Sequence, residues 1–554
     1  MRARWPSIHL CVPGLCESAG AGNVVDEQPR GSSFHVSSFG LRDAFDHEWL
    51  VSGLGKKREL LTTLGEKRLK RELGLLDTTM MGIGGAICAG VFVTLGYAAT
   101  LAGTALIVAM VLCGIINLFT MLSYAELGAA LPSAGGEYTF AKVSFGGFFS
   151  FATGWFEWIS NMFYAAFSSV GFAFLLSYVV GPSINIPLTA VIIVTVFSLI
   201  NIKGIKETGF TQTALVIILL GLLGAFAVSG LVQTPKISAM ELSAPEGFLG
   251  VLKASAFIFV VYLGGEAIAV AQGEIKNPGK TIPRAILLSC FALIIIYTVI
   301  AFVVFRFATP GELEGKASPL AYVAEQIVGP IGVGVVTVAG IIAALTSVNT
   351  SIMAHSRVAY ALARDGYFPK KLFSLHGRFS TPHVAVVLGS IFTAAVAATG
   401  VVNFVTYATD FGFIIGFIFV NLSLMKLRRD KPSLVRPFKV PFYPLTPILG
   451  IATCVLLILF LDPGTLFIGT ELFLFGLVAY YVRMVGYSRA YLAVGGIDFG
   501  LSGFSALLAC LVISNSLPIT LSREVMWAVA GVAVIVSITC LIAGLLSVTR
   551  DSED

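Results

Sequence analysis

The chain has 554 residues, of which 56% are hydrophobic and only 12% are charged. A soluble globular domain is about a quarter charged, and a mean hydropathy of +0.89 leaves too little polar surface to cover a soluble protein of this length. The composition therefore excludes a soluble enzyme. The net charge of +5 comes from basic residues spread over many loops, so it does not indicate a nucleic-acid partner.

Apolar runs of roughly 20 residues recur along the chain, and a helix needs about that many residues to cross a bilayer. They are preceded by residues 1–70, which we expect to form a mobile cytoplasmic tail. We expect residues 71–430 to hold a core of ten spans and residues 431–554 to hold four more. The fourteen predicted spans lie near 75–101, 104–130, 147–180, 186–202, 209–232, 248–272, 284–307, 331–358, 383–400, 403–425, 444–461, 465–485, 496–514 and 525–548.

The loops between these spans alternate in basic charge, and cytoplasmic loops are the ones enriched in Lys and Arg. Few basic residues fall on the side predicted to be outside, namely Lys236, Arg306, Lys316 and Arg523. The loops predicted to be inside carry more basic residues, including Lys203, Lys276, Lys280, Arg364, Lys370, Lys371, Lys426, Arg428, Arg429 and Arg436. This pattern predicts a multi-pass protein of the cell membrane with both termini in the cytoplasm.

Two predicted spans contain glycine clusters near their middle. The first span carries Gly82-Ile83-Gly84-Gly85-Ala86-Ile87-Cys88-Ala89-Gly90, and the sixth carries Tyr262-Leu263-Gly264-Gly265-Glu266. Glycine inside a helix costs about 1 kcal/mol relative to alanine, so each cluster weakens its helix at one depth. The clusters are five spans apart, and an odd number of spans turns a second repeat upside down. The spacing therefore predicts an inverted repeat.

An unwound helix at the middle of a membrane frees backbone N–H and C=O groups, which a polar substrate can satisfy. Freed N–H groups favour a carboxylate, and freed carbonyls favour an ammonium, so one pair of breaks suits both ends of an amino acid. The alternative is close helix packing without a ligand. Gly82, Ala86 and Gly90 have the small-xxx-small spacing that permits it.

These residues resemble the amino acid–polyamine–organocation permeases. The resemblance covers about residues 70–450. It rests on Gly82 to Gly90 followed by Val91-Phe92-Val93, on Tyr124-Ala125-Glu126-Leu127 with Gly135-Gly136-Glu137-Tyr138, on Gly264-Gly265-Glu266 followed by Glu274 to Pro278, on Ala363-Arg364-Asp365-Gly366, and on Arg436 to Pro441. In its number of predicted spans, fourteen, the chain resembles the cationic amino acid transporter branch of this family.

The resemblance implies an all-α polytopic membrane protein with a LeuT-type fold. Spans 1–5 and 6–10 would form a five-plus-five inverted repeat, followed by about four C-terminal spans. It also implies secondary active transport of amino acids by alternating access.

The resemblance further implies a substrate site at the two breaks. The N–H groups of Cys88, Ala89 and Gly90 would hold the substrate carboxylate. The carbonyls of Ala86, Val260 and Leu263, beside Gly264, would hold its ammonium. This sequence departs from the family pattern twice. Cys88 replaces the first glycine of the triplet, and Val260 replaces an aromatic gate, which leaves Phe259 and Tyr262 as the nearest rings.

The coupling ion stays open between sodium, protons and exchange. Proton-coupled members of the family carry a lysine in span five, where this chain has Leu219, so a lysine-based mechanism is not expected. Span eight carries the polar residues Thr346, Ser347, Asn349 and Thr350. They are candidate ion-coupling residues, and packing between helices is the alternative role.

Three carboxylates fall within apolar spans, where lipid exposure would cost each about 2.5–3.5 kcal/mol. They are Glu157, Glu266 and Asp410. Glu266 adjoins the second break and is a candidate proton carrier, and Glu157 is a candidate partner for a cationic substrate. The alternative for each is a charge satisfied by a neighbouring donor.

The leading hypothesis is therefore an amino acid symporter or exchanger. A polyamine or organic-cation permease is the alternative, followed by a channel or a non-transporting sensor. The chain has no H-E-x-x-H motif and no Cys/His metal spacing, so we expect no enzyme activity, no metal and no cofactor. Both a monomer and a homodimer remain open.

Overall fold

The computed structural model describes residues 70–181, 184–237, 241–316, 318–399 and 402–460, with a few single positions between 476 and 542. In these ranges the chain is helical, and its one β pairing is an isolated bridge between Leu73 and Ile275. Residues 1–69, the three spans predicted after residue 461 and the side chain of Asp410 lie outside the described residues.

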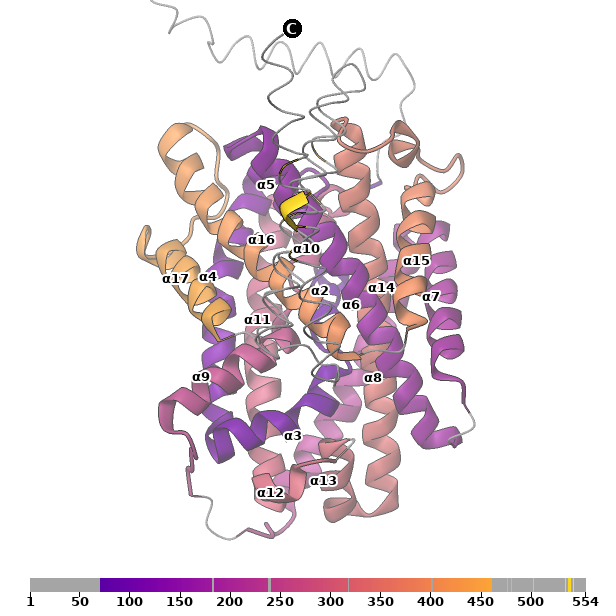
Figure 1. The fold of residues 1–554 in the computed structure, drawn as a ribbon, viewed down its shortest axis with the longest axis vertical. Helices are drawn as coiled ribbons and strands as arrows, with labels where there is room; N and C mark the ends of the chain where they lie inside the picture. Colours follow the sequence, from indigo (N-terminus) through magenta and orange to yellow (C-terminus); the bar gives the residue numbers. More distant parts are fainter. Residues whose placement is uncertain are drawn as a thin grey trace, which may run out of the picture. The chain divides into compact units, whose positions relative to one another are not determined.

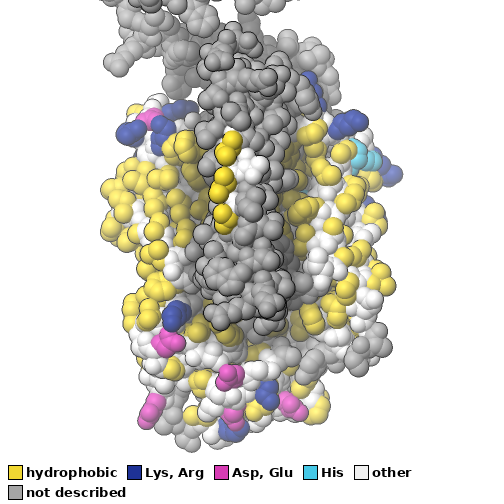
Figure 2. Space-filling model, viewed as in Figure 1, with side chains coloured by type: hydrophobic (Ala, Val, Ile, Leu, Met, Phe, Trp, Pro, Cys, Tyr) yellow, Lys and Arg dark blue, Asp and Glu magenta, His cyan; other side chains and the backbone are white. Residues whose placement is uncertain are grey.

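Eight of the described helices are long and apolar enough to cross a membrane, and two shorter apolar helices, His383–Ala397 and Leu445–Leu459, accompany them. Among the described residues in Figure 2, apolar side chains cover the flanks of the visible face at mid-height, whereas most charged side chains lie toward its two ends. The protein is therefore an all-α, multi-pass membrane protein, as predicted.

The first five predicted spans appear as a continuous series of helices (Figure 1). Span one is divided in two, and a short helix, α5, precedes span three. In order they are α2 (Leu75–Ala86), α3 (Gly90–Ala102), η1 (Gly103–Ala105), α4 (Leu106–Ala130), α5 (Gly136–Ser144), α6 (Gly147–Val180), α7 (Ile186–Lys203) and α8 (Ile205–Val232).

The next five spans repeat this plan, with span six divided like span one. In order they are α9 (Gly247–Ile258), η2 (Phe259–Tyr262), α10 (Ala267–Val270), η3 (Gln272–Glu274), α11 (Pro278–Phe307), α12 (Pro310–Leu313), α13 (Pro319–Val328), α14 (Pro330–Arg364), η4 (Lys370–Phe373), α15 (His383–Ala397) and α16 (Val402–Asp430). An eleventh span follows as α17 (Leu445–Leu459).

Four of the five pairs of spans that are five apart in the sequence pack against each other. The halves of span one contact the halves of span six, as α2 with α10 and α3 with α9. Likewise α4 contacts α11, α6 contacts α14, and α7 contacts α15. Such contacts between equivalent spans of the two halves are expected of an inverted repeat. The chain therefore has the LeuT-type fold.

The helix bundle has two ends that differ in their contacts. At one end, here called the α5 end, Lys142 of α5 forms a 2.6 Å ion pair with Asp365 beyond α14, and Thr381 donates to the Ile202 carbonyl of α7. The opposite end, here called the α12 end, carries α12 and α13 (Figure 1). There Lys236 pairs with Glu312 at 3.1 Å.

Candidate functional site at two interrupted helices

The first interruption separates α2 from α3 at residues 87–89. Ile87 is extended, at φ −72° and ψ 96°, so the helical hydrogen-bond pattern stops there. The N–H of Gly90 donates to the Sγ of Cys88 at 3.2 Å. The carbonyl end of one half-helix and the N–H end of the other thus meet within three residues.

The second interruption follows α9 and lies between η2 and α10. Leu263 is extended, at φ −71° and ψ 151°, and Gly264 has φ +116°, a conformation that favours glycine. The N–H of Gly264 donates to both carboxylate oxygens of Glu266, at 2.9 and 2.8 Å. Glu266 is buried, and its carboxyl group is hydrogen-bonded to the backbone of the break itself.

The two breaks are in direct backbone contact. A Cβ atom added to Gly264 would lie 2.2 Å from the carbonyl carbon of Gly85 and 2.5 Å from the nitrogen of Ala86. A Cβ added to Gly85 would lie 2.8 Å from the Gly264 oxygen. Only glycine at both positions allows this approach.

Two tyrosines from neighbouring spans donate to the carbonyls of the breaks, and sequence reasoning missed both. The hydroxyl of Tyr164 on α6 lies 3.0 Å from the Gly85 oxygen and 3.5 Å from the oxygens of Ala86 and Leu263. The hydroxyl of Tyr297 on α11 donates to the Val261 oxygen at 2.7 Å. The only sequence signal for them was a tyrosine in an apolar run, which packing explains equally well.

The side chains predicted for the substrate site and gate are all buried at these breaks. A Cβ on Gly90 would face Val261 and Phe167, and Ala89 packs closely against Gly171 of α6. The ring of Phe259 lies edge-on to Phe417 of α16, with centroids 6.2 Å apart. The surroundings of the first break are therefore largely apolar.

Tyr262, the other predicted gate ring, points toward α4. Its hydroxyl donates to the Met110 carbonyl at 2.8 Å, and its ring lies edge-on to Tyr297 with centroids 5.0 Å apart. The Tyr262 carbonyl accepts from Asn117 at 3.4 Å. Val260 and Leu263 are joined by a backbone hydrogen bond of 3.2 Å from the Leu263 N–H to the Val260 oxygen.

The four polar residues of span eight, on α14, do not act together. The Ser347 hydroxyl lies 3.3–3.5 Å from the carbonyl oxygens of Gly84, Gly85 and Ile87. Thr346 and Thr350 donate to carbonyls of their own helix, at 2.8 and 3.0 Å. Of the four, Ser347 is thus the one hydrogen-bonded to the first break.

Asn349 lies in a buried network of amides between α7, α8 and α14. Its Oδ1 accepts from Asn201 at 3.0 Å, and its Nδ2 donates to Gln212 Oε1 at 2.9 Å. This network joins α14 to spans four and five rather than to the break.

Glu157, the predicted partner of a cationic substrate, is engaged by α5. Its two carboxylate oxygens accept from the N–H groups of Glu137 and Tyr138, at 3.3 and 3.1 Å. These N–H groups belong to the first turn of α5, where helix donors lack partners within the helix and negative charge is favoured. In this structure Glu157 caps a helix.

Comparison with known proteins identifies the family. A family model described as amino acid permease matches residues 73–484. The chain belongs to the amino acid permease family. The permease is 29% identical over 450 residues to the branched-chain amino acid permease BcaP of Bacillus subtilis (strain 168), an alignment that covers 78% of this chain and 96% of the relative.

Two further relatives are named for other substrates. The methylthioribose transporter of Bacillus subtilis (strain 168) is 27% identical over 427 residues, covering 73% of this chain and 92% of the relative. The lysine-specific permease LysP of Lactococcus lactis subsp. cremoris (strain MG1363) is 26% identical over 443 residues, covering 73% and 85%. The permease is therefore a transporter and not an enzyme.

At the α5 end of the permease, the chain before α2 is joined to the chain after α10. The Leu73 N–H donates to the backbone carbonyl of Glu274 at 3.1 Å, and the Lys276 N–H donates to the backbone carbonyl of Leu73 at 2.9 Å. The Glu274 carboxylate pairs in turn with Arg357 of α14, and both side chains are buried. These contacts tie the ends of spans one and six to span eight.

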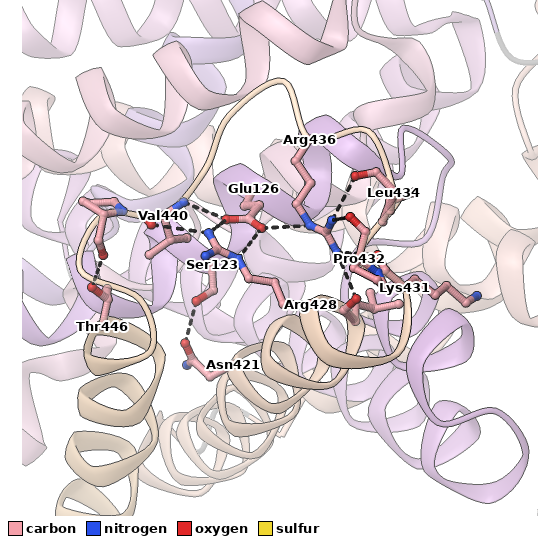
Figure 3. Close-up of polar contacts among 12 residues, drawn as sticks. Ser123, Glu126, Asn421, Arg428, Lys431, Pro432, Leu434, Arg436, Val440 and Thr446 are labelled. Atoms are coloured by element: carbon pink, nitrogen blue, oxygen red, sulfur yellow. Dashed lines mark hydrogen bonds and ion pairs between the residues drawn. The ribbon is translucent and has the colours of Figure 1, made fainter.

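A second ionic link at this end lies around Glu126 of α4 (Figure 3). Arg428 at the end of α16 and Arg436 in the following loop approach its carboxylate from different sides, and the Val440 N–H donates to it at 2.7 Å. Nearby, Ser123 donates to Asn421 at 2.7 Å. The loop between α16 and α17 is thereby fixed to span two.

Proposed function

We propose that the protein is a secondary active transporter that moves a neutral, apolar amino acid across the cell membrane by alternating access. The observation that carries this proposal is the backbone crossing of Gly85 and Gly264, where two interrupted helices meet in the buried core. Such crossings of broken helices are where transporters of this plan hold their substrates.

The backbone groups of the breaks supply both ends of an amino acid site. The N–H groups of Cys88 to Gly90 begin a half-helix, which suits a carboxylate. The carbonyls of Ala86 and Leu263 suit an ammonium, and in this structure the Tyr164 hydroxyl occupies them. A substrate ammonium would bind these two carbonyls, while Tyr164 keeps its 3.0 Å hydrogen bond to the Gly85 oxygen and so holds the first break in place.

The residues around the two breaks favour a substrate with a neutral side chain. Val261 and Phe167 face the position of Gly90, and the two carboxylates predicted within spans three and six, Glu157 and Glu266, already accept backbone hydrogen bonds. A polyamine or a cationic side chain would need an uncommitted anionic partner, because a buried charge without one is costly. The name of the branched-chain relative BcaP agrees with a neutral substrate.

Among the predicted ion-coupling residues, we retain Ser347. Its hydroxyl lies among break carbonyls, and hydroxyl and carbonyl oxygens are the ligands that hard cations prefer. Thr346, Asn349 and Thr350 remain less direct candidates because none of their hydrogen bonds leads to a break, whereas Ser347 contacts break carbonyls as well as the Ala343 carbonyl of its own helix.

We also propose that the α5 end faces the cytoplasm. The loops that meet there carry most of the basic residues outside the spans, as the orientation rule for membrane proteins requires. Both termini and the tail of residues 1–70 then lie in the cytoplasm, and spans 11–14 follow the transport core.

The test is uptake of labelled amino acids into proteoliposomes, with sodium, proton and counter-substrate gradients imposed separately. We expect saturable uptake of neutral apolar amino acids. Gly90→Leu should abolish uptake because its side chain would fill the space before Val261. Gly224→Leu, at a position in α8 with open space around it, is the matched control. Uptake by the Gly90 variant at the normal rate would refute the assignment of the site.

A further inference from the structure

Three carboxylates are buried together on one side of the second break. They are Glu137 on α5, Glu157 on α6 and Glu266 before α10, each no more than 1% exposed. Across the described residues, no Lys or Arg lies within ion-pairing distance of any of them. Like charges in a low-dielectric interior disfavour ionisation of all three at once.

Two of the three carboxylates have donors for both oxygens. Glu157 accepts from the first turn of α5, and Glu266 accepts from the Gly264 N–H with both of its oxygens. Hydrogen bonds to the charged form favour it. Glu157 and Glu266 therefore have hydrogen-bond donors for both of their oxygens.

Glu137 is held differently. Its Oε1 accepts a short hydrogen bond from the Tyr124 hydroxyl of α4, but its Oε2 is buried with no hydrogen-bond partner. This oxygen lies against α16, where a Cβ added to Gly416 would overlap it. An ionised oxygen without a donor in such a place is costly, whereas a protonated carboxyl is neutral.

The groups around Glu137 do little to stabilise its ionised form. Tyr124 of α4 is its one donor, while Glu157 of α6, Glu266 at the break and Cys454 of α17 bring no positive charge. The cation on α5, Lys142, pairs with Asp365 beyond α14, which also accepts from the Tyr138 hydroxyl. Burial, followed by the charge of Glu157, raises the pKa of Glu137 well above the ordinary carboxyl value.

We propose that Glu137 binds and releases the proton that drives transport, with its unpartnered oxygen as the protonation site. In this structure the carboxyl is covered by α16, so its proton is held. A movement of α16 away from α5 would admit water to the carboxylate and release the proton. The inference rests on the proposed transport function and takes the proton, rather than a metal cation at Ser347, as the ion that drives uptake.

The experiment uses the full-length protein in proteoliposomes that contain a pH-sensitive dye. Two reactions are compared for the same substrate, namely homoexchange, which moves no net proton, and accumulation driven by an imposed pH gradient. A gradient of about one pH unit can support about tenfold accumulation per coupled proton. The variants are Glu137→Gln and, as a matched control, Glu325→Gln on α13, where the side chain is exposed.

We expect Glu137→Gln to lose pH-driven accumulation and substrate-dependent proton entry, so that homoexchange is the reaction that remains. Glu325→Gln should keep both. Tyr124→Phe removes the donor that lowers the pKa of Glu137, so the midpoint of its pH–activity profile should move to higher pH. This shift tests the assignment even if Glu137→Gln fails to fold.

The outcomes separate the two proposals. If the wild-type protein shows homoexchange but no response to a pH gradient, or if Glu137→Gln still accumulates substrate, the role of Glu137 is overturned and the transport function stands. An unshifted pH profile in Tyr124→Phe would also overturn it. If the wild-type protein moves no amino acid at all, the proposed function itself fails.

Discussion

The guanidinium of Arg357 and the carboxylate of Glu274 form two hydrogen bonds, of 3.1 and 3.2 Å, in a fully buried pair. Arg357 belongs to α14, whereas Glu274 directly precedes the residue that bridges to Leu73. The pair thus joins span eight to the point where the chains before span one and after span six meet. Alternating access that opens the α5 end has to separate these elements.

Glu274→Gln should loosen this junction. Removing one partner of a buried pair costs about 3–5 kcal/mol because the remaining charge is left uncompensated. We expect the amides of Leu73 and Lys276, which close the bridge, to exchange hydrogen for deuterium faster by about two to four orders of magnitude. Glu312→Gln, at the α12 end, is the control and should leave these amides unchanged. Equal protection in both variants would mean that the ion pair does not hold the junction.

Gly264→Ala should abolish transport while leaving most of the bundle folded. The added Cβ would overlap the backbone of Gly85, and φ +116° alone costs a non-glycine residue about 1–3 kcal/mol. Gly224→Ala, in open space on α8, should change stability by no more than about 1 kcal/mol. Uptake and the unfolding midpoint in detergent are measured together. Normal uptake by Gly264→Ala would show that the crossing of the breaks is not required.

Tyr164→Phe should weaken transport through the substrate site. The change removes the 3.0 Å hydrogen bond to the Gly85 carbonyl and leaves it only the longer contact with the Ser347 hydroxyl at 3.4 Å, and a buried group that loses its main donor costs about 1–3 kcal/mol. We expect a fall in kcat/KM of about tenfold or more. The control is Tyr322→Phe on α13, whose ring lies beneath Lys316. Identical kinetics in the two variants would exclude Tyr164 from the site.

The sequence predicted the spans well because hydrophobic length and loop charge are local signals. The third span was predicted at 147–180, which is the extent of α6, and the fourth at 186–202 matches α7 to within one residue. The glycine clusters likewise marked where the first and sixth spans are interrupted, because glycine weakens a helix wherever it lies.

Side-chain partners could not be read from the sequence in the same way. Glu157 was predicted to serve a cationic substrate, yet its donors come from α5, a nine-residue helix too short to show as a span. The span-eight residues looked alike, but helix rotation directs Ser347 to the break and Asn349 to Gln212. Which face of a helix meets which neighbour is decided by packing across the whole fold.

Glu126→Gln should destabilise the α5 end through the link shown in Figure 3. The change leaves Arg436, which is 7% exposed, and the partly buried Arg428 without their shared carboxylate, at a cost of about 3 kcal/mol. Glu246→Gln breaks an exposed pair with Lys253 and should cost no more than about 1 kcal/mol. The measurement is the unfolding midpoint in detergent. Equal unfolding midpoints for Glu126→Gln and Glu246→Gln would show that the buried link adds no stability.

Asp365 should make the contact between α5 and α14 sensitive to acid. Although burial opposes the charge, the Arg364 guanidinium and hydrogen bonds from Lys142 and Tyr138 lower the pKa of Asp365 below its ordinary value. A carboxyl with a lowered pKa in the folded state stabilises the protein above the unfolded-state pKa of about 3.9. That contribution is lost as the pH falls through the lowered value.

The stability difference between wild type and Asp365→Asn should therefore be complete at neutral pH and shrink toward zero as the pH falls below about 3.9. Unfolding midpoints of both proteins, measured in one detergent across this range, give the difference directly. Asp430→Asn, which removes an exposed carboxylate at the end of α16, is a control for the general effect of losing one charge. A difference between wild type and Asp365→Asn that stays constant down to the lowest pH would show that the Asp365 charge is not what holds α5 against α14.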